Sequence, residues 1–453
     1  MNSRLAPKTQ GHGQAADGMS PSNLLLSRAT SAQPGRRNRL ARFFRILDLY
    51  QSDFGRLPKT IKITGTSGKG SVCAILESIL LKDGSRVCTF TSPHLTSPNE
   101  RIRLNGSVIS NEAFDSAAEE AKPFFDEIIN VLGKESQPSF FETMLLLALH
   151  ISRTASVNIL LLEVAVGGYN DVVSLFSSPL SAITTIDLDH LNELGNCVEE
   201  IAADKAGIAS SGSTLVLGPS VVDPAKSIIF TDVNRRGVEI VQADRSRIVS
   251  LDNTRSGFEV QVGNLRLKFP LPGAFQLDNL ATAITLFESA RSLGWAHAWS
   301  SIAGASRAHW PARLEFVSGP PDWLLDAAHN PLAFVELRKY LEEYYPSSKI
   351  ALVFGASEKD KAIEGLQLLA PLFTTIFFTG GFYRSAIHAL DELYLSPSLA
   401  GKTVFASSPL EALHLVRSHD YQFDLTVVTG SIFLVGCWKD LLASSPSPAS
   451  ELE

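Results

Sequence analysis

Short apolar runs alternate with helical patterns along most of this chain. In Val72–Leu80 and Leu277–Arg291, apolar residues recur every three or four positions, which is typical of a helix with one buried face. The runs that predict buried strands are Thr60–Ile63, Arg86–Phe90, Asn158–Val166, Leu180–Ile186, Trp323–Leu325, Ile350–Phe354, Thr375–Thr379 and Leu425–Thr429. Strands that alternate with helices predict an α/β fold with a mostly parallel sheet.

One region follows a different rule. Arg247–Leu251, Phe258–Val262 and Leu265–Phe269 alternate polar and apolar residues with a period of two. Gly263-Asn264 separates the last two runs and is a favourable two-residue hairpin turn. We therefore expect a small antiparallel piece attached to the first domain.

The length indicates more than one domain, because 453 residues exceed what a single core usually holds. We expect an extension at residues 1–42, a first α/β domain at 43–308, a linker at 309–316, a second α/β domain at 317–442 and a loose tail at 443–453.

The extension differs from the rest in composition. It is rich in Ser, Gln, Gly and Arg, and Asp17 is its only acidic residue. That composition fits either a disordered segment or an organelle transit peptide. The lack of a convincing amphipathic helix favours disorder, so we expect a cytoplasmic protein, with a mitochondrial location as the alternative.

Charge and hydropathy exclude several partner classes. The net charge is −7, so no basic field argues for nucleic acid. Apolar runs such as Met144–Leu149 end long before the roughly 18 residues of a membrane helix, so we expect no membrane partner. The four cysteines show no paired or metal-ligand spacing, which favours a reduced compartment.

The strongest chemical signal lies between the first strand and the first helix of the first domain. A Gly-rich turn there would point backbone N–H groups and a helix N-terminus at a phosphate, and Lys69 would reach the outer phosphates. The predicted cradle consists of Gly65, Thr66, Ser67, Gly68, Lys69, Gly70 and Ser71. The loop is shorter than the usual P-loop, which disfavours a kinase or GTPase. The alternative is a Gly-rich turn that only closes a strand–helix unit.

Two further strand ends are expected to meet this cradle, because ligands gather at the carboxyl ends of parallel strands. Glu163 ends an apolar run and is followed by Gly167-Gly168, and His190 follows the next run. A lone buried carboxylate is costly unless it is paired or bound to metal, so Glu163 is a candidate ligand. His190 is a site candidate, although it could instead cap a loop.

Eight segments appear in the order found in one known family. They are Gly65–Ser71, Ser92–Leu95, Glu100–Gly106, Phe140–Glu142, Leu188–His190, Asp204–Ile208, Asp326–Pro331 and Thr429–Gly436. Together they resemble the folylpolyglutamate synthase and dihydrofolate synthase family, relatives of the Mur ligases, from about Leu47 to Leu442. The resemblance implies an N-terminal Mur-ligase-like P-loop domain and a C-terminal Rossmann-like glutamate-ligase domain.

The resemblance also implies an activity. Family members use ATP and Mg²⁺ to convert a carboxylate to an acyl phosphate, which the amine of L-glutamate attacks to give an amide. The expected acceptor is dihydropteroate or a folate, and the expected assembly is a monomer.

Residue roles follow from the resemblance alone. It implies Ser92, Glu163 and His190 at magnesium, and Gln276, Asn279, Arg313 and Asp326 beside the nucleotide. The catalytic set would be Lys69, Glu163, His190, Lys205, Asp326 and His329. Arg101, Phe141, Asp171 and His329 would contact substrate. Lys205 matches a lysine that the family can carbamylate.

Purely structural roles remain alternatives for three of these residues. Lys205 shares its predicted helix with Glu199 and Glu200 and could form a surface ion pair. Arg313 could brace the linker, and Phe141 could be core packing.

The chain departs from the family after its central strand. The family commonly carries Arg, Thr and Asn where this chain has Tyr169, Val173 and Ser174. A tyrosine cannot imitate the planar, multi-donor guanidinium group. Two alternatives therefore stand beside the folate ligase: a paralogue that acts on a different carboxylate, and a catalytically weakened nucleotide-binding protein.

Overall fold

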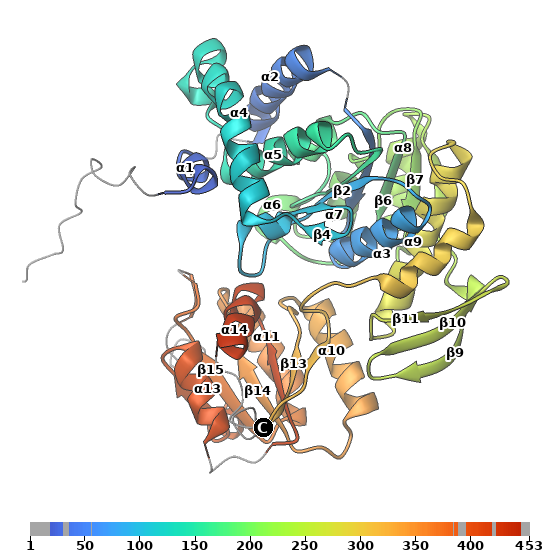
Figure 1. Cartoon of the computed structure of the whole chain (residues 1–453). Helices are drawn as coiled ribbons and strands as arrows, with labels where there is room; N and C mark the ends of the chain where they lie inside the picture. Colours follow the sequence, from blue (N-terminus) through green and yellow to red (C-terminus); the bar gives the residue numbers. More distant parts are fainter. Residues whose placement is uncertain are drawn as a thin grey trace, which may run out of the picture.

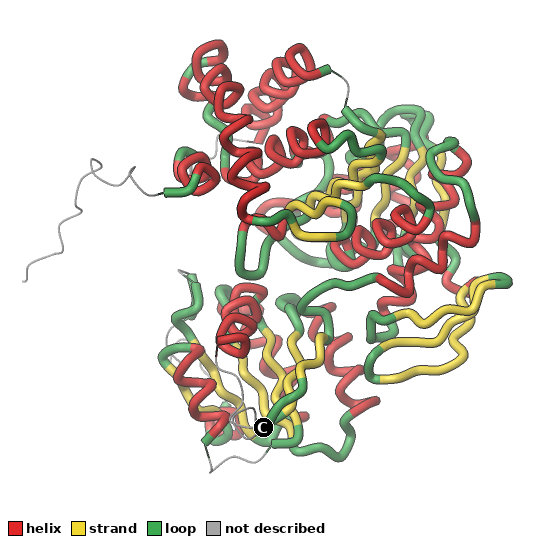
Figure 2. The backbone as a smooth tube through the Cα atoms, in the orientation of Figure 1, coloured by secondary structure: helices red, strands yellow, loops and turns green. Residues whose placement is uncertain are grey.

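Three β-sheets organise the described part of the chain (Figure 1). The computed structural model describes residues 19–29, 36–55, 57–383, 385–387, 396–418 and 423–444. Figure 2 shows two layered α/β bodies, with the three-stranded sheet at the side of the first. The predicted α/β class is confirmed.

The first sheet is mostly parallel and places β1 at its centre. Its order is β4-β3-β2-β5-β1-β6-β7-β8, and its only antiparallel pairings are those of β3 with β2 and with β4. The strands are β1 Lys59–Thr64, β2 Val87–Phe90, β3 Ile102–Leu104, β4 Ser107–Val108, β5 Ile159–Glu163, β6 Leu180–Ile183, β7 Thr214–Leu217 and β8 Glu239–Gln242. Ile63 of β1 is in register with Glu163 of β5, so both strands end at the same edge.

Helices cover both faces of this sheet, which explains the unbroken apolar runs. Successive residues of β5 contribute to two different cores: Ile159 and Leu161 to one, Leu160 and Leu162 to the other. The helices of this part are α1 Pro21–Ser27, α2 Arg36–Phe54, α3 Lys69–Lys82, α4 Asn111–Leu132, α5 Phe140–Thr154, α6 Leu191–Leu194, α7 Val198–Ala206, α8 Ala225–Asn234 and α9 Phe275–Ser292. None of the described helices has the length and apolarity needed to cross a membrane.

The antiparallel piece has the predicted form. It consists of β9 Ile248–Thr254, β10 Gly257–Val262 and β11 Leu265–Phe269 in the order β11-β10-β9. Gly263 adopts a φ of 59°, the left-handed conformation that a tight hairpin turn requires.

The third sheet forms the second α/β body. Its order is β12-β13-β17-β14-β15-β16, with β12 as the antiparallel edge. The strands are β12 Glu315–Val317, β13 Asp322–Leu325, β14 Ile350–Phe354, β15 Thr375–Thr379, β16 Thr403–Ala406 and β17 Leu425–Thr429. The helices are α10 Pro331–Tyr344, α11 Lys359–Leu369, α12 Pro397–Ala400, α13 Pro409–Arg417 and α14 Ile432–Ser444.

Two of the expected boundaries need correction. Residues 315 and 316 of the expected linker belong to β12, because that strand pairs with β13 and Glu315 forms an ion pair of 2.6 Å with Lys439. Residues 443 and 444 of the expected tail belong to α14, and the rest of the tail lies outside the described residues.

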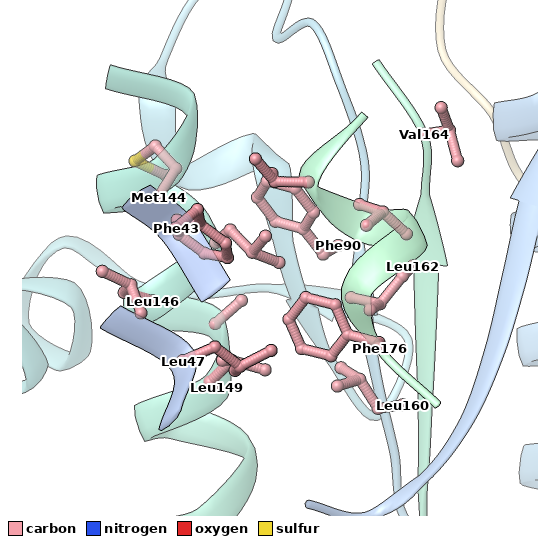
Figure 3. Close-up of a cluster of buried hydrophobic side chains, with 14 of the residues drawn as sticks. Phe43, Leu47, Phe90, Met144, Leu146, Leu149, Leu160, Leu162, Val164 and Phe176 are labelled. Atoms are coloured by element: carbon pink, nitrogen blue, oxygen red, sulfur yellow. The ribbon is translucent and has the colours of Figure 1, made fainter. Parts of the chain in front are cut away.

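The prediction that residues 1–42 are disordered is wrong where the structure describes them. Leu25 of α1 is buried in the core, and α2 begins at Arg36. Farther along α2, Phe43 and Leu47 lie beside Phe90 and Met144 in the same core (Figure 3). The apolar stripe that docks α2 begins just after the expected boundary, while the arginine-rich first turns look polar in the sequence.

Charge pairing is what allows this arginine-rich start to pack. Arg42 is buried, and its Nη2 donates to both carboxylate oxygens of the buried Glu142, at 2.7 and 2.5 Å. Ahead of it, Ser22 of α1 donates to Asp115 of α4. Residues 1–18 and 30–35 lie outside the described residues, so the targeting alternative stays a prediction.

Two adjacent phenylalanines test the docking of α2. Phe43 is fully buried, whereas Phe44 is 56% exposed. Phe43→Ala should lower the free energy of unfolding by about 3–5 kcal/mol, because it leaves a cavity, and Phe44→Ala by less than about 0.5 kcal/mol. Urea denaturation of both variants measures the difference. Equal small losses would show that α2 does not pack on the core.

Candidate active site

The Gly-rich turn between β1 and α3 has the form of a phosphate cradle. Gly68 is the N-cap of α3 with a φ of 85°. A Cβ there would lie 2.4 Å from Oδ1 of Asn279, and a Cβ on Gly70 would lie 2.6 Å from the Trp310 ring. These approaches explain both glycines, and they place Trp310, which the sequence did not single out, against the turn.

Polar side chains hold the ends of this turn. Lys69 Nζ donates to the carbonyls of Gly65 at 2.9 Å and Thr66 at 3.3 Å. Gln276 Nε2 donates to the buried Ser71 hydroxyl at 3.2 Å, and Asn279 Nδ2 donates to Gln276 Oε1 at 2.9 Å. The start of α9 therefore braces the start of α3 and fixes the cradle.

Glu163 is a buried carboxylate beside the cradle. Its Oε2 accepts from the backbone N–H of Ser92 at 3.0 Å. Burial raises the pKa of Glu163, and the nearby charges of Lys69, Arg313 and Arg101 only partly offset that effect. A cation bound here would complete the charge balance.

Asp326 organises the segment that carries Arg313. Its two oxygens accept from the backbone N–H groups of Leu314 and Ala328, each at 2.9 Å. Burial raises the pKa of Asp326, and the charge of Arg313 opposes the rise. Both carboxylate oxygens thus serve the backbone, while the charge of Arg313 acts on Asp326, Glu163 and His329 together.

Lys205 is buried, so the alternative of a surface ion pair is wrong. Burial and the charge of Lys69 lower the pKa of Lys205 to about 7, against the opposing pull of Asp204 and Asp189. A lowered pKa enlarges the neutral fraction of this amine. A neutral amine is the form able to react with CO₂, as carbamylation requires.

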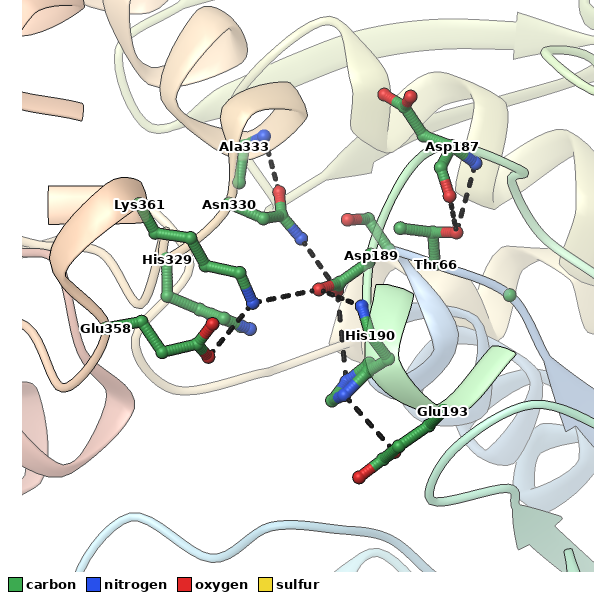
Figure 4. A network of polar contacts seen from close by, with 12 residues as sticks. Thr66, Asp187, Asp189, His190, Glu193, His329, Asn330, Ala333, Glu358 and Lys361 are labelled. Carbon is green, nitrogen blue, oxygen red and sulfur yellow. Dashed lines mark hydrogen bonds and ion pairs between the residues drawn. The ribbon is translucent and has the colours of Figure 1, made fainter. Parts of the chain in front are cut away.

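A polar network joins the two α/β bodies beside this group (Figure 4). Asp189 accepts from Lys361 of α11 at 3.1 Å and from Asn330, the N-cap residue of α10, at 3.3 Å. Burial alone would raise the pKa of Asp189, but His190 and Lys361 lower it to about 2.

Asp189 and Lys361 were not among the predicted site residues. Asp189 lies in Leu188–His190, one of the eight segments that carry the family resemblance, so the sequence could have identified it. Lys361 stands in a run of charged residues at the start of α11, where nothing in the sequence distinguishes it from a solvated lysine.

The predicted histidines take different places. The side chain of His190 is 43% exposed and lies 3.9 Å from Asp189 and 3.6 Å from Glu193. His329 has Nδ1 2.8 Å from the carbonyl of Ala327, and burial lowers its pKa. A cavity of about 250 Å³ opens beside His329 and is lined also by Lys361, Glu358, Ser431 and Phe433.

Of the residues expected to contact substrate, Arg101 lies near the charged group, whereas Phe141 and Asp171 make structural contacts. Arg101 lies near Glu163, donates to His94 Nδ1 at 3.0 Å and stacks on Phe140 at 5.0 Å, and burial lowers its pKa to about 10. Phe141 meets Phe90 edge-on at 5.4 Å, a core contact. Asp171 is buried and caps the 3-10 turn Val172–Leu175.

The donor set fits magnesium if phosphate and water complete it. Among the described residues, no three His, Cys, Asp or Glu side chains gather as a metal cluster. Mg²⁺ commonly binds one or two carboxylates together with phosphate oxygens and waters. Glu163, buried beside the cradle, provides such a carboxylate. Ser92 donates its backbone N–H to Glu163, and His190 is close enough to the cradle for the charge of Lys69 to act on it.

Comparison with known proteins shows which family this chain resembles. The family described as Mur ligase middle domain matches residues 63–287. The chain is 30% identical to the probable dihydrofolate synthetase of Schizosaccharomyces pombe, over 83% of this chain and 91% of that protein. It is 29% identical to the dihydrofolate synthase/folylpolyglutamate synthase of Bacillus subtilis, over 83% and 89% of the two chains.

The chain belongs to the folylpolyglutamate synthase and dihydrofolate synthase family. Its fold agrees with the folylpolyglutamate synthase of Mycobacterium tuberculosis complexed with ADP, with a TM-score of 0.79 and 25% identity over 94% of this chain and 98% of that one. The predicted fold, a Mur-ligase-like P-loop body followed by a Rossmann-like α/β body, is confirmed.

Tyr169, which stands where the family commonly has Arg, does not belong to the buried charged group beside the cradle. Its side chain is 64% exposed, and its backbone N–H donates to the carbonyl of Asp204 at 2.7 Å. The substitution therefore leaves the loop in place but supplies no cation.

The ion pair between Asp189 and Lys361 gives a test with a defined pH dependence. The pKa of Asp189 in the folded protein is about 2, below the ordinary 3.8 of an aspartate side chain. The stabilisation is therefore present above about pH 4 and is lost as the pH falls toward 2.

Lys361→Met should lower the free energy of unfolding at pH 7 by about 1–2 kcal/mol, with a shrinking difference as Asp189 becomes protonated. Lys339→Met, which removes an exposed surface pair with Glu336, should cost less than about 0.5 kcal/mol. Urea denaturation between pH 7 and pH 3 measures both. A Lys361 difference that grows on acidification would contradict the assignment.

Proposed function

We propose that this protein is an ATP-dependent ligase that joins L-glutamate to the carboxylate of dihydropteroate or a folate and releases ADP and phosphate. The observation that carries the proposal is the charged group at the edge of the first sheet. The charges of Lys69 and Arg313 act there on the buried Glu163, and the charge of Lys69 acts on the buried Lys205. The M. tuberculosis relative with the same fold binds ADP, which supports nucleotide binding at this cradle.

The chain supplies what phosphoryl transfer needs, which is mainly positioning and charge neutralisation. The N–H groups at the start of α3 would hold the phosphates, and Lys69 and Arg313, whose charges both act on Glu163, would neutralise phosphate charge. Glu163, with Ser92 and His190, would hold Mg²⁺, and the bound ion would supply positive charge for the transferred phosphoryl group.

The cavity beside His329 suits L-glutamate. Lys361 offers a cation for a carboxylate, and Ser431 offers a hydroxyl donor. A neutral His329 can hydrogen-bond the amine that attacks the acyl phosphate. Closure of the second body over the first would protect that intermediate from water, and Asp189 with Lys361 already links the two bodies.

The acceptor is the part of the proposal most in need of experiment. Phosphate release should be measured with ATP, Mg²⁺ and L-glutamate, comparing dihydropteroate, tetrahydrofolate and no acceptor, with the product mass determined. Glutamate-dependent turnover with one pterin identifies the acceptor. Turnover with neither would favour the alternative that Tyr169 motivates, a ligase for another carboxylate or a weakened nucleotide-binding protein.

Lys69→Ala should reduce turnover by at least about a thousandfold, because the variant lacks the cation at the outer phosphates. Lys82, at the exposed end of the same helix, is the matched control, and Lys82→Ala should retain activity. Initial rates and circular dichroism of both variants provide the measurement. Normal turnover in a folded Lys69→Ala protein would rule out the cradle assignment.

Glu163→Gln keeps the shape of the side chain but removes its charge. We expect a loss of activity that raised Mg²⁺ partly restores, because the variant weakens cation binding rather than the fold. The dependence of the rate on Mg²⁺ concentration, measured at saturating ATP, reports this directly. An unchanged rate at all Mg²⁺ concentrations would contradict the metal role.

We propose further that the protein acts as a monomer on small molecules and without nucleic acid, which its net charge of −7 and its family support. Size-exclusion chromatography with light scattering tests the first point.

A further inference from the structure

The loop at residues 164–171 borders the charged group on the side of the first body. It starts directly after Glu163 and ends at Asp171. Thr64, the last residue of β1, donates to the carbonyl of Gly167 at 2.5 Å, so the loop also abuts the strand that feeds the cradle. The same loop contains Tyr169, where the chain departs from its family.

The carboxylates of Asp171 and Asp204 hold this loop by hydrogen bonds. Asp171 accepts from Ala165 N at 3.2 Å and Val173 N at 2.8 Å. Asp204 accepts from Gly168 N at 2.8 Å and from the side-chain amide of Asn170 at 2.7 Å. Since Asp204 directly precedes Lys205, the loop and Lys205 share one support.

A cation reaches the loop from a distant part of the sequence. Arg39 of α2 donates from Nη2 to the carbonyl of Asn170 at 2.7 Å. Its charge also opposes the rise that burial causes in the pKa of Asp171. Nε of Arg39 is buried and meets no hydrogen-bond acceptor among the described residues, so one N–H donor of the guanidinium is unpaired.

We propose that Arg39 is a positioning residue for the carboxylate substrate, holding the 164–171 loop against Asp204 and Lys205. Helix α2 thus brings to the loop, from outside, a planar guanidinium that Tyr169 cannot provide from within. The inference rests on the proposed function, because it takes this loop to border the acceptor.

Three variants test the proposal. Arg39→Met removes the charge and the donors while keeping the aliphatic length, and Arg39→Lys keeps only the charge and a compact donor. Arg45→Met removes an exposed arginine from the same helix and serves as the control. Each protein is assayed for kcat and for the KM of the pterin acceptor and of ATP. Hydrogen–deuterium exchange of the loop is measured without substrate.

We expect Arg39→Met to raise the KM of the acceptor about tenfold and the KM of ATP less than about twofold, with faster exchange in the loop. Arg39→Lys should fall between Arg39→Met and the wild type, and Arg45→Met should match the wild type. A purely structural defect would instead lower kcat or raise both KM values together.

Unchanged loop exchange in Arg39→Met, or an unchanged acceptor KM, overturns the proposal. The outcome is distinguishable from failure of the proposed function. If the wild type turns over neither pterin, the ligase assignment fails, whereas the exchange comparison of Arg39→Met with Arg45→Met still decides whether Arg39 holds the loop.

Discussion

The structure depends on one constraint: ionic groups gather where the buried strands β1, β5 and β6 end. Parallel pairing brings Ile63 and Glu163 into register, so the cradle and the carboxylate must share one edge. Glu163 and Lys205 are buried there, and Asp326 is buried just after β13 of the second body. Charges this deep are costly alone, and each of these groups is offset by opposite charges or backbone donors. The elements around this edge provide those opposite charges and backbone donors.

Two elements hold this edge from outside the first sheet. The second body contributes Asn330 and Lys361, which bind Asp189, and its Asp326 orders the backbone around Arg313. Helix α2 contributes Arg39, which donates to the loop that follows Glu163. The site is therefore assembled from three separated parts of the chain, which suits a reaction with three reactants and a reactive intermediate.

The sequence predicted the sheets well because burial leaves a clear pattern. The long apolar runs of β5 and β14, and the period of two in β10 and β11, each reflect a single dominant environment. It failed for α2, since an arginine-rich turn looks disordered until Glu142 is seen to neutralise Arg42. Short edge strands such as β12 were also missed, because three residues carry too little pattern.

The sequence by itself determined the cradle, the residues at the strand ends and the family resemblance, because these depend on local spacing and on residue type. It could not determine which residues meet from afar. Lys361 looks like any solvated lysine until α11 is packed against Asp189, and Arg39 like part of a basic tail until α2 docks. Pairing between distant residues is set by tertiary packing, and only the folded structure decides it.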